Sequence, residues 1–199
     1  MDNGSVSTHR EPLVSICMGV YNARKYLIKT LESILAQDYP HFELLISDNG
    51  SQDRSDEICR KYARQDKRII YSRHETNINP LENSTGMLDR TSGDYHLWAS
   101  DHDIYHPQFI SSLLEVYRNA DDSVVLCYPD TLRIDENNRS LGIIEEDIDT
   151  RGLSPTERFK KVIWGLNFCT PIYGLYRMAA LKEIWKVRHI TGPDRVYLP

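Results

Sequence analysis

Short apolar runs alternate with amphipathic stretches along the first 130 residues. Apolar runs that end at polar or turn residues predict buried strands at residues 13–18, 42–47, 68–72, 95–100 and 124–128. Apolar side chains at helical spacing between them predict helices at residues 26–35, 55–65, 80–88 and 107–117. This alternation is typical of an α/β fold: a Rossmann-like, mostly parallel central sheet with helices on both faces.

The pattern changes after residue 128. Residues 135–139 are typical of a turn between two hairpin arms, and helices are predicted at residues 155–164 and 178–185, on either side of a further apolar run. We therefore expect a small C-terminal part made of a β-hairpin and helices. Residues 1–12 are expected to form a polar leader, and residues 13–199 a single domain.

Composition narrows the classes of function. The chain is 40% hydrophobic and 27% charged, with a formal net charge of −5 and no basic cluster, so we expect no nucleic-acid partner. No apolar run approaches the roughly 18 residues of a membrane span, and residues 1–12 lack the apolar core of a signal peptide. We expect a cytoplasmic protein without a transmembrane segment. Its 4 cysteines are far apart in sequence and are expected to be free thiols.

Polar residues gather where the first four predicted strands end. They are found at residues 19–22, 48–49, 77–79 and 101–103. Because the carboxyl ends of parallel strands meet at one edge of a sheet, these residues should line a single ligand-binding crevice. Glycine-rich motifs for dinucleotides or for nucleoside triphosphates are missing from the sequence. The phosphates of a nucleotide ligand would therefore have to be bound by groups other than a glycine-rich loop. Asp101 and Asp103 can both face one divalent cation that bridges two phosphate oxygens.

Other interpretations of the aspartate pair stay open. Asp101 and Asp103 can instead cap a helix that begins near Pro107. His102 and His106 raise the alternative of a zinc or iron site. We favour oxygen ligands for a diphosphate site and expect His102 to point away from it.

Alternatives also stay open elsewhere in the chain. Asp48 can simply begin a turn, and Asn77 and Asn79 can serve to shape a loop. One predicted helix combines basic residues with a tryptophan, at Arg158, Lys160, Lys161 and Trp164. This helix fits either peripheral contact with the inner face of a membrane or an ordinary amphipathic helix on the protein surface.

Four segments together resemble the family 2 glycosyltransferases, which have the GT-A fold of the nucleotide-diphospho-sugar transferase superfamily. The matching segments are residues 14–22, 47–53, 77–93 and 98–103. Their order, spacing and shared position at strand ends make the combination specific, and the resemblance covers roughly residues 13–130. It implies that about residues 13–105 form the nucleotide-sugar-binding half and about residues 106–199 the acceptor-side half.

The resemblance also implies roles for individual residues. Asp194 resembles the general base that takes the proton of the acceptor hydroxyl. Asp101 and Asp103 are expected to hold Mn²⁺ or Mg²⁺, with Asp103 as the more direct ligand. The residues expected to bind the nucleotide sugar are Val20, Tyr21, Asn22, Asp48, Asn79, Asn83 and Asp101. The first three of these are expected to line a uracil pocket, and Asp48 to bind the base.

The implied activity is transfer of a sugar from a nucleotide-diphosphate sugar, such as a UDP-sugar, to an acceptor hydroxyl with inversion at the anomeric carbon. The acceptor is expected to be a saccharide or a lipid-linked molecule. By analogy, the reaction is expected to take part in the synthesis of a surface polysaccharide. Two other functions stay open. One is a sugar-phosphate nucleotidyltransferase, and the other is a non-catalytic GT-A domain that only binds a partner.

The sequence departs from the family pattern in several places. Gly19 stands where a proline is more usual, and Asn49 replaces a common second acid. His102 lies between Asp101 and Asp103. None of these changes removes a charge that the reaction needs. Family members usually continue well past the catalytic acid, so we expect incomplete acceptor-side elements and a truncated form with weak or absent transferase activity.

Overall fold

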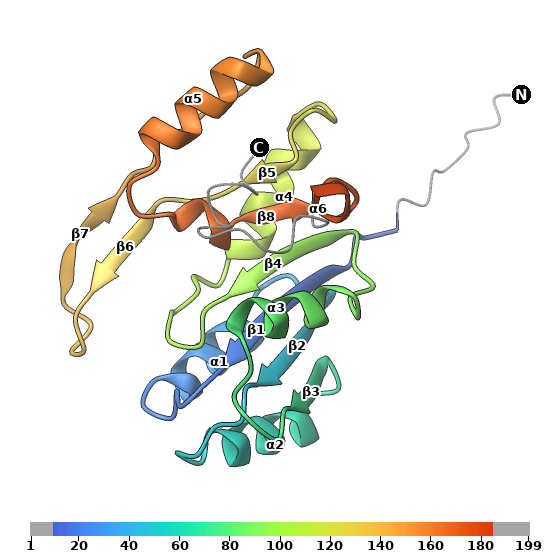
Figure 1. Ribbon diagram of the computed structural model, residues 1–199, viewed down its shortest axis with the longest axis vertical. Helices are drawn as coiled ribbons and strands as arrows, with labels where there is room; N and C mark the ends of the chain where they lie inside the picture. The colour runs from blue at the N-terminus through green and yellow to red at the C-terminus, as the bar shows by residue number, and fades with distance from the viewer. Residues whose placement is uncertain (1–9, 185–199) are drawn as a thin grey trace, which may run out of the picture.

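The computed structural model describes residues 10–184 and contains the predicted alternation of strands and helices (Figure 1). The strands are β1 (Val14–Val20), β2 (Phe42–Asp48), β3 (Ile69–Arg73), β4 (Tyr95–Ala99), β5 (Leu126–Cys127), β6 (Thr131–Ile134), β7 (Ser140–Ile144) and β8 (Leu175–Arg177). The helices are α1 (Leu27–Leu35), α2 (Ser55–Gln65), α3 (Pro80–Leu88), α4 (Phe109–Asn119), α5 (Pro155–Gly165), the 3-10 helix η1 (Thr170–Tyr173) and α6 (Met178–Ile184).

Six of the strands form one sheet in the order β3-β2-β1-β4-β8-β5. The pairs β1–β2, β2–β3 and β1–β4 are parallel, whereas β8 runs antiparallel to both β4 and β5. The predicted mostly parallel sheet is therefore confirmed. In the β1–β2 register Val20 lies opposite Asp48, so the loops that follow these two strands begin side by side.

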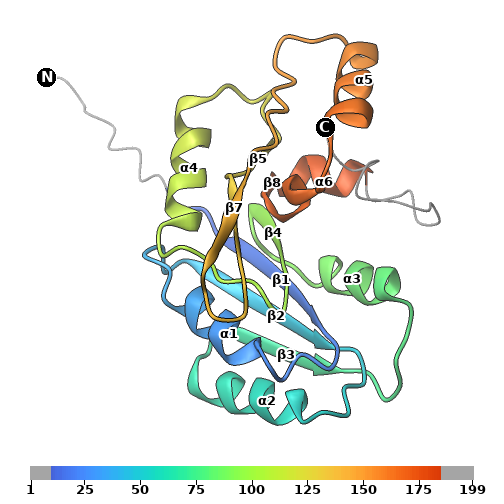
Figure 2. The ribbon, with the colours of Figure 1, turned by 90° about the vertical axis from the view of Figure 1, so that its left-hand side faces the viewer.

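Helices cover both faces of the sheet, as expected (Figure 2). Strand side chains alternate between the faces, so Ile16 and Met18 join the core shared with α1 and α4, while Cys17 packs with Met87 of α3. Helix α6 contributes Leu181 to a smaller cluster on the α3 side. The helices thus bury both faces of the parallel strands and leave their carboxyl ends open.

The second half of the chain is less compact. Strands β6 and β7 form the expected hairpin as a separate two-stranded sheet, and α5 lies beyond it (Figure 1). Helix α5 begins with a capping box in which Ser154 and Glu157 cap each other, and it buries only Val162. Within residues 10–184, every helix is too short or too polar to cross a bilayer.

Some boundaries differ from the prediction. Strand β1 does not end at Gly19 but continues to Val20, because both residues pair with β2. Strand β5 is shorter than residues 124–128 and contains only Leu126 and Cys127. The expectation of free thiols is confirmed for all four cysteines.

Candidate functional site

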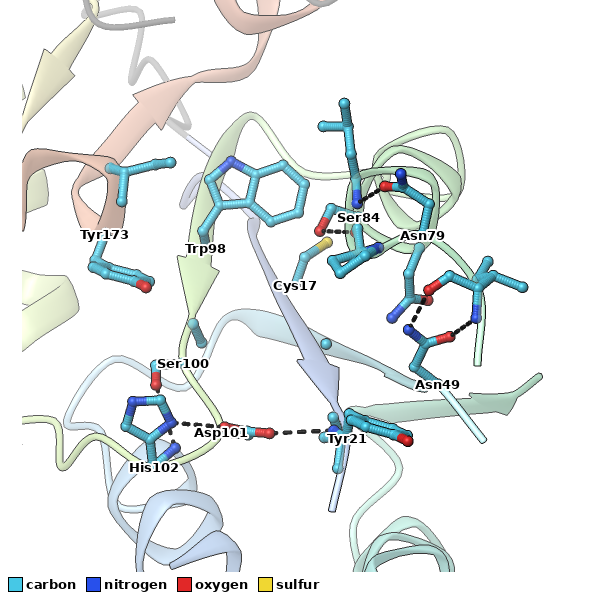
Figure 3. Close-up of a pocket in the computed structure, with 18 of the residues that line it drawn as sticks. Cys17, Tyr21, Asn49, Asn79, Ser84, Trp98, Ser100, Asp101, His102 and Tyr173 are labelled. Atoms are coloured by element: carbon cyan, nitrogen blue, oxygen red, sulfur yellow. Dashed lines mark hydrogen bonds and ion pairs between the residues drawn. The ribbon is translucent and has the colours of Figure 1, made fainter. Parts of the chain in front are cut away.

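A pocket of about 780 Å³ opens at the carboxyl ends of β1 and β4 (Figure 3). One side is polar and comes from the loops after β1, β2 and β3 and from the first turn of α3. The other side is formed by Trp98 of β4 together with residues of η1, β8 and α6. The lining residues are Cys17, Gly19, Val20, Tyr21, Asn49, Asn77, Ile78, Asn79, Pro80, Leu81, Asn83, Ser84, Trp98, Ala99, Ser100, Asp101, His102, Ile172, Tyr173, Tyr176 and Leu181.

Hydrogen bonds join the loops that follow the strands into one rim. The backbone N–H of Tyr21 donates to Oδ2 of Asp101 at 3.3 Å, which links the loops after β1 and β4. The N–H of Asn49 donates to the carbonyl of Val20 at 2.8 Å, which links the loops after β1 and β2. The predicted meeting of strand ends at one edge is therefore confirmed.

The carboxylate of Asp48 is fully buried beside the pocket. It accepts hydrogen bonds from the Ser51 N–H at 2.8 Å and the Tyr71 hydroxyl at 3.1 Å, and Arg73 Nε lies 3.6 Å from it. Burial raises the pKa of the Tyr71 phenol, and the Asp48 charge raises it further. These partners hold the Asp48 carboxylate inside the protein, whereas the next residue, Asn49, lines the pocket. Contact between Asp48 and a base stays a prediction.

The rim after β4 carries Asp101, His102 and Asp103. Asp101 lines the pocket with its side chain 17% exposed, and its Oδ1 lies 2.8 Å from Nδ1 of His102. The expectation that His102 points away from the pocket is wrong, because this hydrogen bond turns the ring toward Asp101 and places it in the lining (Figure 3). Asp103 is exposed next to the pocket but is not one of its lining residues.

The described part of the chain, residues 10–184, contains no cluster of three or more histidine, cysteine or acidic side chains that could hold a metal by protein ligands alone. Such a cluster is what the zinc or iron alternative requires. Mg²⁺ and Mn²⁺ need less from the protein, since one or two carboxylates can be completed by substrate phosphates and water. The hard oxygen donors of Asp101 and Asp103 fit that chemistry.

Three predicted binding asparagines have different surroundings. Asn79 lines the pocket and caps α3, with Oδ1 accepting from the Leu81 N–H at 2.8 Å. Asn83 also lines the pocket, although it is buried and bonded through its carboxamide to Ser47 and His74. Asn22 does not line the pocket.

The backbone at Asn22 takes a left-handed conformation, with φ at 52°. Its Oδ1 accepts from the Gln52 N–H at 2.9 Å, and its own N–H donates to Ser51 Oγ at 3.0 Å. Asn22 therefore ties the loop after β1 to the loop after β2.

Sequence reasoning missed most of the apolar side of the pocket. Tyr173, Tyr176 and Leu181 come from segments far along the chain, and only the tertiary packing of η1, β8 and α6 brings them to β4. Cys17 also lines the pocket, but burial raises the pKa of its thiol, so it is not suited to act as a nucleophile. The predicted general base, Asp194, lies outside the described residues.

Known proteins share this sequence pattern and fold. The chain is 29% identical over 136 residues to an uncharacterized glycosyltransferase of Rickettsia typhi, RT0329, covering 68% of this chain and 42% of that protein. The chain thus spans less than half the length of that relative. Its fold matches S. aureus TarS in complex with UDP, with a TM-score of 0.63 and 19% identity over 92% of this chain and 53% of TarS.

A second structural neighbour is the mannosyltransferase PcManGT from Pyrobaculum calidifontis in complex with GDP-Man and Mn²⁺. It matches with a TM-score of 0.60 and 13% identity over 88% of this chain and 47% of that protein. Both neighbours have the GT-A fold, so the expected fold class is confirmed. The model of the family described as glycosyl transferase family 2 matches residues 15–185. The chain therefore belongs to glycosyl transferase family 2.

Proposed function

We propose that this chain carries the donor site of a glycosyltransferase that moves a sugar from a UDP-sugar to an acceptor hydroxyl with inversion. The observation that carries the proposal is the position of Asp101, which is bonded to the Tyr21 backbone at the rim of a pocket large enough for a nucleotide sugar. Family membership and the UDP complex of TarS support the choice of donor.

The polar side of the pocket has the groups that a nucleotide needs. Tyr21 is 47% exposed at the rim and offers an aromatic face for a base, while the neighbouring Val20 lines the pocket although its side chain belongs to the buried core. Asn79 caps α3 and Asn83 lies near the start of this helix, where the positive end of the helix dipole favours anionic groups.

The phosphates are assigned to the rim after β4. Asp101 and Asp103 would hold Mn²⁺ or Mg²⁺, and a bound cation stabilises the negative charge that develops on the departing diphosphate. Tyr21 holds the Asp101 carboxylate through its backbone N–H, which fixes the carboxylate before the donor binds. The Mn²⁺ complex of PcManGT supports this assignment.

Asp194 is proposed as the general base on the acceptor side, and the support for it is the resemblance of its sequence segment to the family pattern. A carboxylate that removes the proton of the acceptor hydroxyl typically accelerates a reaction by about 10²–10⁴-fold. Asp194→Asn should keep UDP affinity and lose transfer to a saccharide or lipid-linked acceptor. Retained turnover would assign the base to another residue.

A calorimetric titration of UDP with and without Mn²⁺ tests the donor site. We expect Mn²⁺ to strengthen UDP binding to the wild type. In Asp101→Asn or Asp103→Ala, the factor by which Mn²⁺ raises UDP affinity should be at least about tenfold smaller. Asp130→Ala is the matched control, because this exposed acid follows β5 and does not line the pocket. Equal UDP affinity with and without Mn²⁺ in all four proteins would contradict the metal-diphosphate assignment.

A further inference from the structure

The side chain of Asn49 pairs with both backbone groups of a single residue on another loop. Its Nδ2 donates to the carbonyl of Ile78 at 2.9 Å, and its Oδ1 accepts from the N–H of the same residue at 2.8 Å (Figure 3). Asn49 is only 4% exposed, although it lines the pocket. One carboxamide therefore satisfies both backbone groups of Ile78, as a paired strand would.

The neighbouring glycine brings the two loops into backbone contact. Gly50 has a φ of +75°, and a Cβ added to it would lie 2.9 Å from the carbonyl carbon of Thr76 and 3.0 Å from the nitrogen of Asn77. The turn after β2 therefore lies directly against residues 76–78. Asn49 holds this segment by hydrogen bonds, and Gly50 allows the close approach.

The segment held in this way forms a wall of the candidate donor site. Asn77, Ile78 and Asn79 all line the pocket, and Asn79 caps the first turn of α3. Between β3, which ends at Arg73, and α3, which begins at Pro80, the chain has no regular secondary structure. The position of this wall therefore depends on a few specific contacts with the turn after β2.

We propose that Asn49 is a positioning residue that fixes residues 77–79, and with them the first turn of α3, at the distance from β1 that a nucleotide requires. The inference rests on the proposed donor site and gives a reason for the amide at a position where the family often has an acid. An ionised carboxylate can accept from the Ile78 N–H but has no proton for the Ile78 carbonyl, and it would repel that oxygen.

The experiment compares Asn49→Asp and Asn49→Ala with the wild type in UDP titrations at pH 7.5 and pH 5.5, with Asn137→Asp in the exposed hairpin turn as the matched control. We expect both Asn49 variants to bind UDP about tenfold more weakly at the higher pH, and the control to bind like the wild type. Burial beside the Ile78 carbonyl oxygen should raise the pKa of the new acid, so that at the lower pH part of it gains a proton and can donate again. The deficit of Asn49→Asp should then shrink while that of Asn49→Ala persists.

Nearby titratable groups are controlled by expressing each affinity relative to the wild type at the same pH. The groups closest in the fold are Asp48, its partners Tyr71 and Arg73, and His74, whose N–H donates to the Asp48 carbonyl. All of them are unchanged in the variants.

Amide hydrogen exchange at Ile78 gives a readout that needs no ligand. We expect exchange at this amide to be at least about tenfold faster in Asn49→Ala, because its acceptor is removed. Unchanged exchange would overturn the positioning role, and so would unchanged UDP affinity in both variants despite faster exchange. Absence of UDP binding by the wild type would instead count against the donor site itself, and exchange at Ile78 would then decide alone whether Asn49 holds the wall.

Discussion

The two halves of this chain differ in how they are held together. In the first half, core residues such as Ile16, Leu44 and Ile46 are at most 1% exposed on the face of the sheet that α1 and α4 cover. In the second half, Leu132 and Ile143 on the hairpin are 55% and 63% exposed. The strands of the first half thus lie in an apolar core, which α4 and β8 of the second half share, whereas the hairpin and α5 leave much of their apolar surface uncovered within the described structure.

Polar contacts take over part of the role of a core in the second half. The buried carboxylate of Glu146 accepts hydrogen bonds from the N–H groups of Asn167 and Phe168, and the Tyr128 hydroxyl donates to the Glu146 carbonyl at 2.6 Å. These contacts join the segment after the hairpin to the segment after α5. The comparison teaches that the main sheet and the helices on it are shaped by packing, and the segments from β6 to α5 by a few directional bonds.

The sharpest test of this difference pairs one isoleucine from each half. Ile46→Ala removes a side chain that is 1% exposed in β2 and should lower the free energy of unfolding by about 3 kcal/mol. Ile143→Ala, at a side chain 63% exposed in β7, should lower it by less than about 0.5 kcal/mol. Urea unfolding measures both, and similar losses would mean that the hairpin face is covered in solution.

A second prediction concerns a buried histidine in the first half. His96 in β4 is fully buried, and neither ring nitrogen has a hydrogen-bond partner among the described residues. Burial, together with the positive charge of Lys182, lowers its pKa from 6.5 to about 3. Because the folded protein keeps this ring neutral, its contribution to stability is complete above pH 6.5 and is lost as the pH falls toward 3.

The expected loss is about 2 kcal/mol at pH 5, and its slope approaches about 1.4 kcal/mol per pH unit. Thermal or urea unfolding at pH 7.5, 6 and 5 checks it. His96→Leu should have a flatter pH dependence than the wild type, since it has no ring to protonate. An equal pH dependence in the two proteins would show that His96 is accessible to protons in the native state.

The smallest expected effect belongs to α5. Trp164 is 83% exposed, so Trp164→Ser should change the free energy of unfolding by less than about 0.5 kcal/mol. Val162→Ala in the same helix is the comparison, because Val162 is the residue that α5 buries. A larger loss for Trp164→Ser than for Val162→Ala would indicate that the outer face of α5 is packed in solution.

The same contrast explains how far the sequence could predict the structure. Helices α2 and α3 have the predicted bounds, 55–65 and 80–88, because their apolar spacing reflects packing on one sheet. The apolar run at residues 172–176 did not reveal that η1 ends at Tyr173 and β8 begins at Leu175. That break depends on Gly174, where an added Cβ would lie 2.6 Å from the Cys127 carbonyl oxygen, a contact between distant segments.

The candidate site was predictable to a similar degree. Asp101, Tyr21 and Asn79 follow strand ends, and the rule for parallel sheets places them at one edge. The burial of Asp48 and the turn of His102 toward Asp101 depend on side-chain partners that no periodic pattern encodes. Tyr173 reaches the pocket through η1, which only the packing of the second half positions.

The place of β8 between β4 and β5 has a consequence for biosynthesis. Strands β1–β4 are complete once Ala99 has left the ribosome, and β4 can then pair with β1. Strand β4 then keeps a free hydrogen-bonding edge until Leu175–Arg177 emerge, because β5 reaches the sheet only through β8. A nascent chain stalled within α5 would expose that edge to strand pairing with other polypeptides, and it would be protected only when β8 is made.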